Sequence, residues 1–166
     1  LEQKKQVLYL LPEIALTVQM MERLQRVFGN RLGIYHSKYA DAERVEIWQK
    51  QLSQNPYDVI LGARSAVFLP FQRLGLVIID EEHETSYKQQ EPMPRYHARS
   101  AAIMLAQMFG AKTLLGTATP CVETYHNAKT GKYALVELFQ RYQGIELPEI
   151  QIVEIEIGRA SCRERV

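Results

Sequence analysis

Short apolar stretches alternate with amphipathic stretches along most of this 166-residue chain, and this alternation constrains the fold more than any other feature. The apolar stretches are typical of strands, and the stretches whose apolar residues recur every three or four positions are typical of helices. We predict strands at 7–11, 32–35, 58–61, 74–80 and 112–115, with two later ones at 133–138 and 150–155. We predict helices at 15–28, 41–52, 98–109 and 122–129.

The predicted strands are apolar on both faces, which indicates that helices cover the sheet on both sides. The sequence therefore predicts an α/β fold, a three-layer sandwich around a mostly parallel sheet. Helical spacing predicts core-facing side chains at Ala42, Val45, Trp48 and Leu52, and at Met20 and Met21. Ligands of such sheets bind beyond the carboxyl ends of the strands, so the residues that follow each strand are the candidate site.

Composition excludes little. Twenty basic and nineteen acidic residues give a net charge of +1, which neither indicates nor excludes a nucleic-acid partner. The two cysteines, Cys121 and Cys162, form no CxxC pair, which argues against a zinc site or disulfide framework within these residues. No apolar run approaches the roughly 18 residues of a membrane span, so we expect a cytoplasmic protein with no membrane partner.

Both ends of the chain differ from the rest. The chain begins at Leu1, and its first polar residues lead straight into a strand, so we expect a fold that is incomplete at the N-terminus. Residues 156–166 are basic, poor in apolar residues and without a period. We interpret them as a non-native tail, with a basic linker as the alternative, which leaves residues 1–155 as one partial domain.

The strand at 74–80 ends in two adjacent carboxylates, Asp80 and Glu81, followed by Glu82 and His83. Phosphoryl transfer needs a Mg²⁺ ion on the phosphate oxygens and a group that orients the attacking water. Asp80 can hold the metal through its water shell while Glu81 acts on the water. The alternative is a strand that ends in an acidic turn. A zinc protease is excluded, because Tyr87 stands where a second metal-binding histidine would be needed.

The strand at 112–115 leads into Gly116-Thr117-Ala118-Thr119-Pro120. The hydroxyls of Thr117 and Thr119 can hydrogen-bond to the region of Glu82 and His83 and report the nucleotide state. By itself the segment is also compatible with an ordinary loop.

Three further segments carry groups suited to phosphates or bases. Residues 10–17 join a strand to the N-terminus of a helix, where main-chain N–H groups bind phosphate, although plain helix entry is the alternative. Gly62, Arg64 and Ser65 follow another strand and suit a backbone phosphate. The loop at 86–99 interleaves aromatic and basic residues, a pattern typical of single-strand binding, although a solvated surface loop is the alternative.

With these motifs in order, the chain resembles the helicase core of the PriA family of bacterial replication-restart helicases, within helicase superfamily 2. The matching runs are LLPEIALT (10–17), YHSKYADAERVEIW (35–48), YDVILGARSAVFLPF (57–71), LGLVIIDEEHETSYKQQEPMPRYHAR (74–99), GAKTLLGTATP (110–120) and, more weakly, ETYHNAKTGKY (123–133). The resemblance implies a RecA-like lobe of the P-loop NTPase class.

The resemblance also implies residue roles. Asp80 and Glu81 match the magnesium-binding and water-activating carboxylates of the Walker B motif, with His83 as a catalytic residue beside them. Glu82, Thr117 and Thr119 match positions that couple hydrolysis to strand movement. The implied DNA-binding residues are Pro12, Glu13, Thr17, Gly62, Arg64, Ser65, Tyr87, Lys88, Arg95 and Tyr96.

For the complete protein, the resemblance implies an ATP- and Mg²⁺-dependent 3′–5′ DNA helicase of replication restart. Its implied partners are single-stranded and forked DNA, the primosome and single-strand-binding proteins, and its implied zinc module lies outside these residues. The family's Gly-rich phosphate loop is expected upstream, so we expect no ATPase from these residues alone and an open sheet edge at 112–115. Thr117 and Cys121 stand where serine is common in the family.

Two other classes of function remain as alternatives. A non-catalytic, helicase-like DNA-binding module would use the same fold without hydrolysis, and a phosphate loop upstream of Leu1 would argue against it. A metal-dependent nuclease using Asp80, Glu81 and His83 is disfavoured, because Gly62 and Gly116 occupy the neighbouring strand exits where more carboxylates would be needed.

Overall fold

The computed structural model describes residues 4–15, 17–36, 39–140 and 144, so the predicted strand at 150–155 and the tail at 156–166 lie outside the described residues. The strands are β1 (Gln6–Leu10), β2 (Leu32–Tyr35), β3 (Val59–Gly62), β4 (Leu74–Ile79) and β5 (Lys112–Leu115). The α-helices are α1 (Val18–Phe28), α2 (Asp41–Leu52), α3 (Ala98–Met108) and α4 (Val122–Lys129). Short 3-10 turns are η1 (Glu13–Ala15), η2 (Gly29–Arg31), η3 (Arg64–Phe68) and η4 (Thr85–Tyr87).

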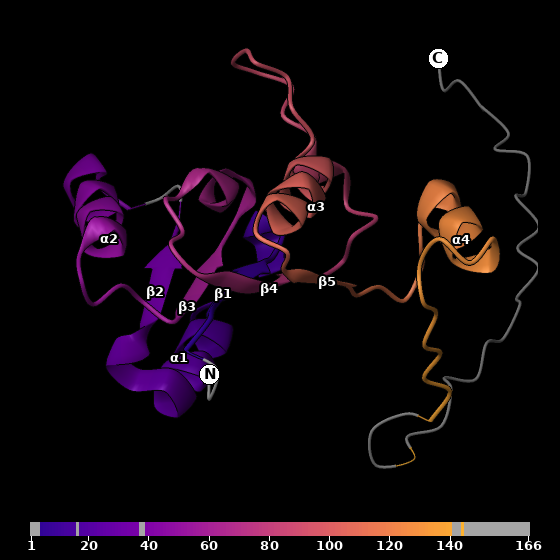
Figure 1. Ribbon diagram of the computed structural model, residues 1–166, viewed down its shortest axis with the longest axis horizontal. Helices are drawn as coiled ribbons and strands as arrows, with labels where there is room; N and C mark the ends of the chain where they lie inside the picture. Colours follow the sequence, from indigo (N-terminus) through magenta and orange to yellow (C-terminus); the bar gives the residue numbers. More distant parts are fainter. Residues whose placement is uncertain (1–3, 16, 37–38, 141–143, 145–166) are drawn as a thin grey trace, which may run out of the picture.

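The described strands form one parallel sheet in the order β2-β3-β1-β4-β5. Helix α1 lies on one face, and α2 and α3 lie on the other, which gives three layers (Figure 1). The predicted α/β sandwich is therefore confirmed. Leu10 is in register with both Gly62 and Ile79, so β3, β1 and β4 end side by side and their following residues share one edge.

The core lies between the sheet and the helices on each face. Sheet residues such as Leu8, Ile60 and Val77 are fully buried. Helix α3 packs on them through Ala98, Ala102 and Ala106, which are all buried and recur every four residues on one face. Small side chains there let the helix approach the sheet closely, which brings the start of α3 near the end of β4. On the opposite face Met20 and Met21 pack against the second core cluster, as predicted.

The orientation of α2 differs from the prediction. Val45, Trp48 and Leu52 are 52%, 42% and 60% exposed, and Ala42 is exposed too, while Ile47 and Gln51 are the buried residues of this helix. The prediction that these four residues face the core is wrong. The Gln6 side chain donates to the Gln51 side-chain oxygen at 2.9 Å, and this buried amide pair fixes which side of the helix faces the sheet.

Two other elements differ from the sequence-based prediction. Helix α1 begins at Val18, because Thr17 caps it by accepting a hydrogen bond from the Met20 N–H and residues 13–15 form a separate 3-10 turn. The predicted strand at 133–138 is wrong: residues 134–139 have no regular structure, and Val136 and Leu138 are 81% and 89% exposed. Apolar composition alone does not make a strand without a neighbour to pair with.

Strand β5 forms an edge of the described sheet, since its partner there is β4. Lys112, Thr113 and Leu114 are exposed, as expected for an open edge at 112–115. The chain then leaves the sheet and forms α4 beyond that edge (Figure 1). Among the described residues, no helix has the length and apolarity needed to cross a membrane.

Candidate functional site

Asp80 directly follows β4, and hydrogen bonds hold both its main chain and its side chain in place. Its N–H donates to the Leu10 carbonyl at 3.0 Å, which continues the pairing with β1. One carboxylate oxygen, Oδ2, accepts from the Tyr9 hydroxyl at 3.0 Å, and the other, Oδ1, accepts from the Glu81 N–H at 3.0 Å. Burial, together with the Asp80 charge and hydrogen bond, raises the pKa of Tyr9 to about 12, so Tyr9 is a proton donor to Asp80 at neutral pH.

Glu81 has a left-handed backbone with φ of +47°, which is rare for a residue other than glycine. Such a conformation costs about 1–3 kcal/mol and persists where the surroundings determine it. Here the next residue donates its N–H to the Gly116 carbonyl at 3.0 Å, and the Glu84 N–H donates to the Glu81 carbonyl at 2.8 Å. The half-exposed Glu81 carboxylate is thereby aimed at His83, with 3.5 Å between Oε2 and Nδ1.

His83 joins the end of β4 to the segment that follows β5. Its Nδ1 lies 2.7 Å from the hydroxyl oxygen of Thr117, and that oxygen also accepts from the Thr119 N–H at 3.1 Å. The structure thus brings Glu81, His83 and Thr117 together from two neighbouring strands. Thr119 takes part through its main chain and is exposed.

Glu82 points the opposite way and is fully buried. Its carboxylate accepts hydrogen bonds from the Cys121 N–H at 2.9 Å and the Thr124 hydroxyl at 3.0 Å, and it forms an ion pair with Arg99. Burial raises the pKa of this carboxyl, but the hydrogen bonds from Cys121, Arg99 and Thr124 outweigh that effect and hold its pKa below the ordinary value. Glu82 is therefore an ionised anchor between β4, α3 and α4.

The groups at the end of β4 fit a hydrated magnesium ion. Mg²⁺ prefers carboxylate oxygens and keeps several of its waters. Asp80 supplies such oxygens, and Gly116 leaves the space beside them open: a Cβ added there would lie 3.3 Å from the Asp80 Oδ1. Among the described residues no group of three or more His, Cys, Asp or Glu side chains could hold a metal ion, so Asp80 fits only water-mediated contact with a metal that is held mainly by other groups.

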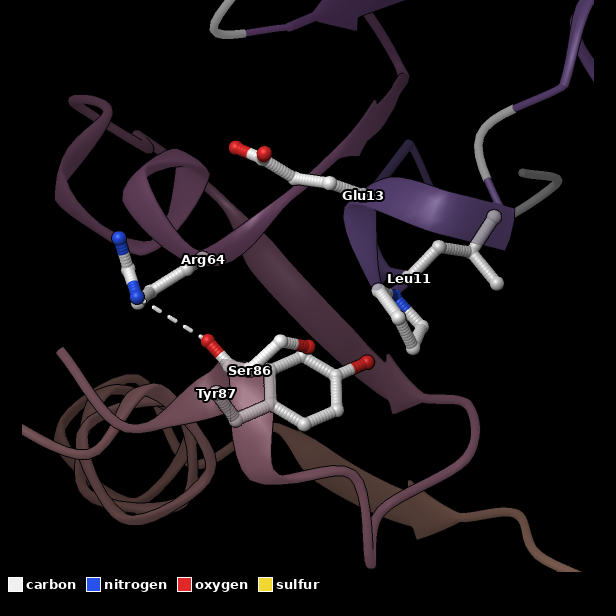
Figure 2. Close-up of a pocket in the computed structure, with 6 residues that line it drawn as sticks. Leu11, Glu13, Arg64, Ser86 and Tyr87 are labelled. Carbon is white, nitrogen blue, oxygen red and sulfur yellow. Dashed lines mark hydrogen bonds between the residues drawn. The ribbon is translucent and has the colours of Figure 1, made fainter. Parts of the chain in front are cut away.

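A second group of predicted residues meets around a small open pocket at the same edge of the sheet. Figure 2 shows its lining residues, which are Leu11, Pro12, Glu13, Arg64, Ser86 and Tyr87. Its volume of about 80 Å³ is well below the roughly 300–1,000 Å³ of small-molecule sites. The pocket is thus too small to hold a whole nucleotide, but it joins three segments that are far apart in the sequence.

Arg64 and Tyr87 connect this pocket to its surroundings. The Arg64 guanidinium donates to the main-chain carbonyl of Ser86 at 3.1 Å (Figure 2) and to that of Lys88 at 3.3 Å. The Tyr87 hydroxyl lies 3.1 Å from the Leu10 carbonyl and 2.6 Å from the Asp80 carbonyl. Tyr87, which the resemblance assigns to DNA binding, is 1% exposed, so its ring is part of the core and presents no face to a DNA base in this structure. Tyr87 thus lies between the pocket and the carboxylates that follow β4.

Of the other aromatic and basic residues of the predicted loop, Arg99 lies on α3, and the rest lie on a projection from residue 88 to 97, which extends away from the sheet ahead of α3 (Figure 1). Lys88 and His97 pair at its base, and the Lys88 amine donates to the Arg95 carbonyl at 2.7 Å. Arg95 is exposed and pairs with Glu91 at 2.8 Å, while the Tyr96 ring packs edge-on against Phe68.

Three residues assigned to DNA binding lie within the local fold, at a helix cap, a strand end and a 3-10 turn. Thr17 caps α1, and Gly62 lies where β3 meets η3, so that an added Cβ would come within 2.5 Å of the Ala66 Cβ. Ser65 is half-buried within η3. These positions support the local fold of the edge where Glu13 and Arg64 are presented.

Sequence reasoning missed four residues of this region: Tyr9, Arg99, Cys121 and Thr124. Arg99 carried a usable signal, because a cation in the first turn of a helix is opposed by the helix dipole and points to an acidic partner. Tyr9 is the one polar-tipped side chain in the β1 run QVLYL after Gln6. Cys121 and Thr124 gave no comparable signal, since their role depends on where α4 begins relative to Glu82.

A parallel sheet in which one strand ends in two adjacent carboxylates, next to a histidine–threonine contact with the neighbouring strand exit, fits a helicase lobe. The model of the DEAD/DEAH box helicase family matches residues 1–128, and the chain belongs to that family.

The relatives are more specific. The chain is similar to the replication restart protein PriA of Chlamydia pneumoniae, with 39% identity over the whole chain and 22% of that protein. It is 42% identical to PriA of Bacillus subtilis over 91% of the chain and 18% of that protein. It is 46% identical to PriA of Helicobacter pylori over 86% of the chain and 22% of that protein. These matches confirm the resemblance to the PriA family, and the chain spans about a fifth of the length of these relatives.

Proposed function

We propose that this chain supplies the hydrolytic carboxylates of an ATP-dependent 3′–5′ DNA helicase that acts in replication restart. The observation that carries the proposal is the contact between the two strand exits, in which the Glu81 carboxylate, His83 and Thr117 form one connected group. An acidic turn without a function would not need a left-handed glutamate whose carboxylate faces a histidine.

In this proposal Asp80 orients the water shell of Mg²⁺ with ATP, and Glu81 accepts a proton from the attacking water. The bound Mg²⁺ supplies charge stabilisation at the phosphate oxygens. Tyr9, by donating to Oδ2 of Asp80, holds this carboxylate at a fixed angle. His83 passes a change at Glu81 to Thr117, and through the Thr117 oxygen to the Thr119 N–H and the segment that leads to α4.

The DNA side of the proposal is supported by the pocket that joins Pro12, Glu13 and Arg64 and by the projection at 88–97. Arg95 offers an exposed charge for phosphates and Tyr96 a ring at the base of the projection. The Lys88 amine joins the two sides of the projection by donating to the Arg95 carbonyl, and the Tyr87 hydroxyl links the base of the projection to the Asp80 carbonyl. Contact with a single strand at the projection would therefore reach Asp80 through the hydrogen bond of the Tyr87 hydroxyl.

We further propose that residues 1–155 belong to one ATP-binding lobe whose Gly-rich phosphate loop is supplied upstream, and that residues 156–166 are not part of it. The phosphate loop, a second lobe and a zinc module would come from the rest of the protein, in the bacterial cytoplasm. Forked and single-stranded DNA, primosome proteins and single-strand-binding protein are the proposed partners, and the similarity to replication restart proteins supports a role beside DNA.

The test uses the full-length protein that contains this sequence. ATP hydrolysis should rise at least about tenfold when single-stranded DNA is added, since DNA contact positions the hydrolytic groups. A duplex with a 3′ single-stranded tail on the loading strand should be unwound, and one with a 5′ tail should not. Hydrolysis that is absent, with or without DNA, would contradict the proposed function, while unwinding from the 5′ tail alone would contradict the polarity.

A further inference from the structure

Arg99 ties the turn after β4 to helix α3 through a buried ion pair. Its Nη1 nitrogen donates to the main-chain carbonyl of Glu82 at 3.2 Å and to the Glu82 carboxylate, and it lies 2.6 Å from the Cys121 sulfur. The side chains of Arg99 and Glu82 are 18% and 0% exposed, so water barely reaches the pair. Net stabilisation is a weak explanation for such a pair, because removing two charges from water offsets much of their attraction.

Glu82 is fixed from several directions at once. Its N–H donates to the Gly116 carbonyl at the end of β5, and its carboxylate accepts from the Cys121 N–H and the Thr124 hydroxyl at the start of α4. Arg99 adds the tether to α3 and is the one cation in this network. Three elements thus meet on one residue of the turn.

The residue immediately before this anchor is Glu81, whose left-handed backbone needs support from its surroundings. If Glu82 were free to shift, Glu81 could return to an ordinary backbone conformation. Because the side chain follows the backbone, the Glu81 carboxylate would then leave its place 3.5 Å from the His83 Nδ1.

We propose that Arg99 is a positioning residue: acting through Glu82, it holds the backbone of Glu81 left-handed and so fixes the Glu81 carboxylate where it can orient the attacking water. This inference rests on the proposed function, because it concerns the rate of hydrolysis at Glu81. It assigns Arg99 no contact with ATP or DNA.

The experiment measures ATP hydrolysis by the full-length protein carrying Arg99→Met, which keeps the length of the side chain and removes its charge. We expect kcat to fall about 10–100-fold, the scale expected from a misplaced catalytic group, with KM for ATP and DNA affinity within about twofold. Rates are normalised to the number of ATP-binding sites, so partial unfolding cannot imitate the effect. Arg99→Lys, which keeps the charge, should recover part of the loss.

A second variant separates positioning from folding. In Arg99→Met combined with Glu82→Gln, neither buried partner is left as an unpaired charge, so the thermal stability lost in Arg99→Met should largely return. The tether between α3 and the Glu82 carbonyl is still missing, so kcat should stay low. If kcat recovers together with stability, or if Arg99→Met raises KM without lowering kcat, Arg99 has no positioning role.

Two controls keep the outcomes distinct. Arg26→Met removes an arginine that is 81% exposed on α1 and should leave the rate unchanged. If the wild-type protein hydrolyses ATP and Glu81→Gln abolishes the reaction, but Arg99→Met is as fast as wild type, the positioning inference alone fails. If the wild-type protein does not hydrolyse ATP, the proposed function itself fails.

Discussion

The turn at 80–84 and the projection at 88–97 are neighbours in the sequence and similarly polar, yet the structure holds them in opposite ways. The turn is bonded to other elements at Asp80, through Leu10, and at Glu82, through Gly116, Cys121 and Arg99. The projection is bonded mostly to itself: Gln89 donates to the carbonyls of Pro92 and Pro94, and Arg95 pairs with Glu91.

Under the proposed function, this difference corresponds to separate roles for the turn in hydrolysis and for the projection in DNA contact. A group that must act on a water molecule has to be in place before the reaction, which requires a rigid surrounding. A segment that follows a flexible strand of DNA gains from exposure and from few outside contacts. Tyr87 stands at the border, because it is buried like the turn but leads directly into the projection.

Among the variants that compare the turn with the projection, Tyr87→Ala should cause the largest loss of stability. Removing a buried aromatic side chain costs about 3–5 kcal/mol, which would lower the melting temperature by roughly 10 °C. Tyr87→Phe keeps the ring but removes the hydroxyl from the Leu10 and Asp80 carbonyls, so we expect a smaller loss of about 1–3 kcal/mol. Thermal unfolding measures both. A loss of less than about 1 kcal/mol in the free energy of unfolding for Tyr87→Ala would show that the Tyr87 ring is not part of the core and is exposed like the projection.

Glu82→Gln should cost about 2–3 kcal/mol at neutral pH, since it removes the charge that accepts four hydrogen bonds. The pKa of Glu82 is lowered in the folded protein, so its contribution is complete above the ordinary value of 4.5 and is lost as the pH falls through the lowered pKa. Melting temperatures measured from pH 6 down to about pH 3 should therefore fall more steeply for wild type than for Glu82→Gln. Parallel curves would show that Glu82 is not a charged anchor.

Tyr96→Ala tests the projection. Its ring packs on the half-exposed Phe68, an edge-on contact worth about 0.5–1.5 kcal/mol, so stability should change little. Loss of a stacking ring should weaken stimulation of the ATPase by single-stranded DNA about tenfold and leave the rate without DNA intact. Tyr125→Ala, which removes a 42% exposed ring on α4, is the control for loss of a tyrosine elsewhere on the surface. Equal losses of ATP hydrolysis with and without DNA would show that Tyr96 supports the hydrolytic turn and does not act through DNA contact.

Arg95→Gln should give the smallest effect. The exposed pair with Glu91 contributes at most about 1 kcal/mol to stability. If Arg95 contacts one phosphate, the slope of log affinity against log salt concentration should decrease by roughly 0.7, measured by titration of fluorescent single-stranded DNA. An unchanged slope would remove Arg95 from the DNA contact surface, and Arg26→Gln provides the control for a distant surface charge.

The sequence predicted the sheet, most helix positions and the meeting of strand exits, because apolar periodicity and parallel topology determine those features. It could not predict which side of α2 faces the core, since the buried contact of Gln51 with Gln6 depends on residues 45 positions apart. The aromatic loop shows the same limit: composition marked Tyr87 and Tyr96 alike, and only packing separates the buried ring from the half-buried one. Likewise Glu82, assigned to coupling, is seen to be a buried anchor only once Arg99 and α4 are in place.

The most direct measurement is ATP turnover by the full-length protein carrying Glu81→Gln, with ATP and DNA binding measured in parallel. Glutamine has the shape of glutamate but cannot accept the proton of the attacking water. Binding should stay within about twofold while kcat falls by at least about 100-fold, the contribution typical of a positioned general base. A variant that binds both ligands and hydrolyses ATP at the wild-type rate would contradict the assignment of this turn as the hydrolytic centre.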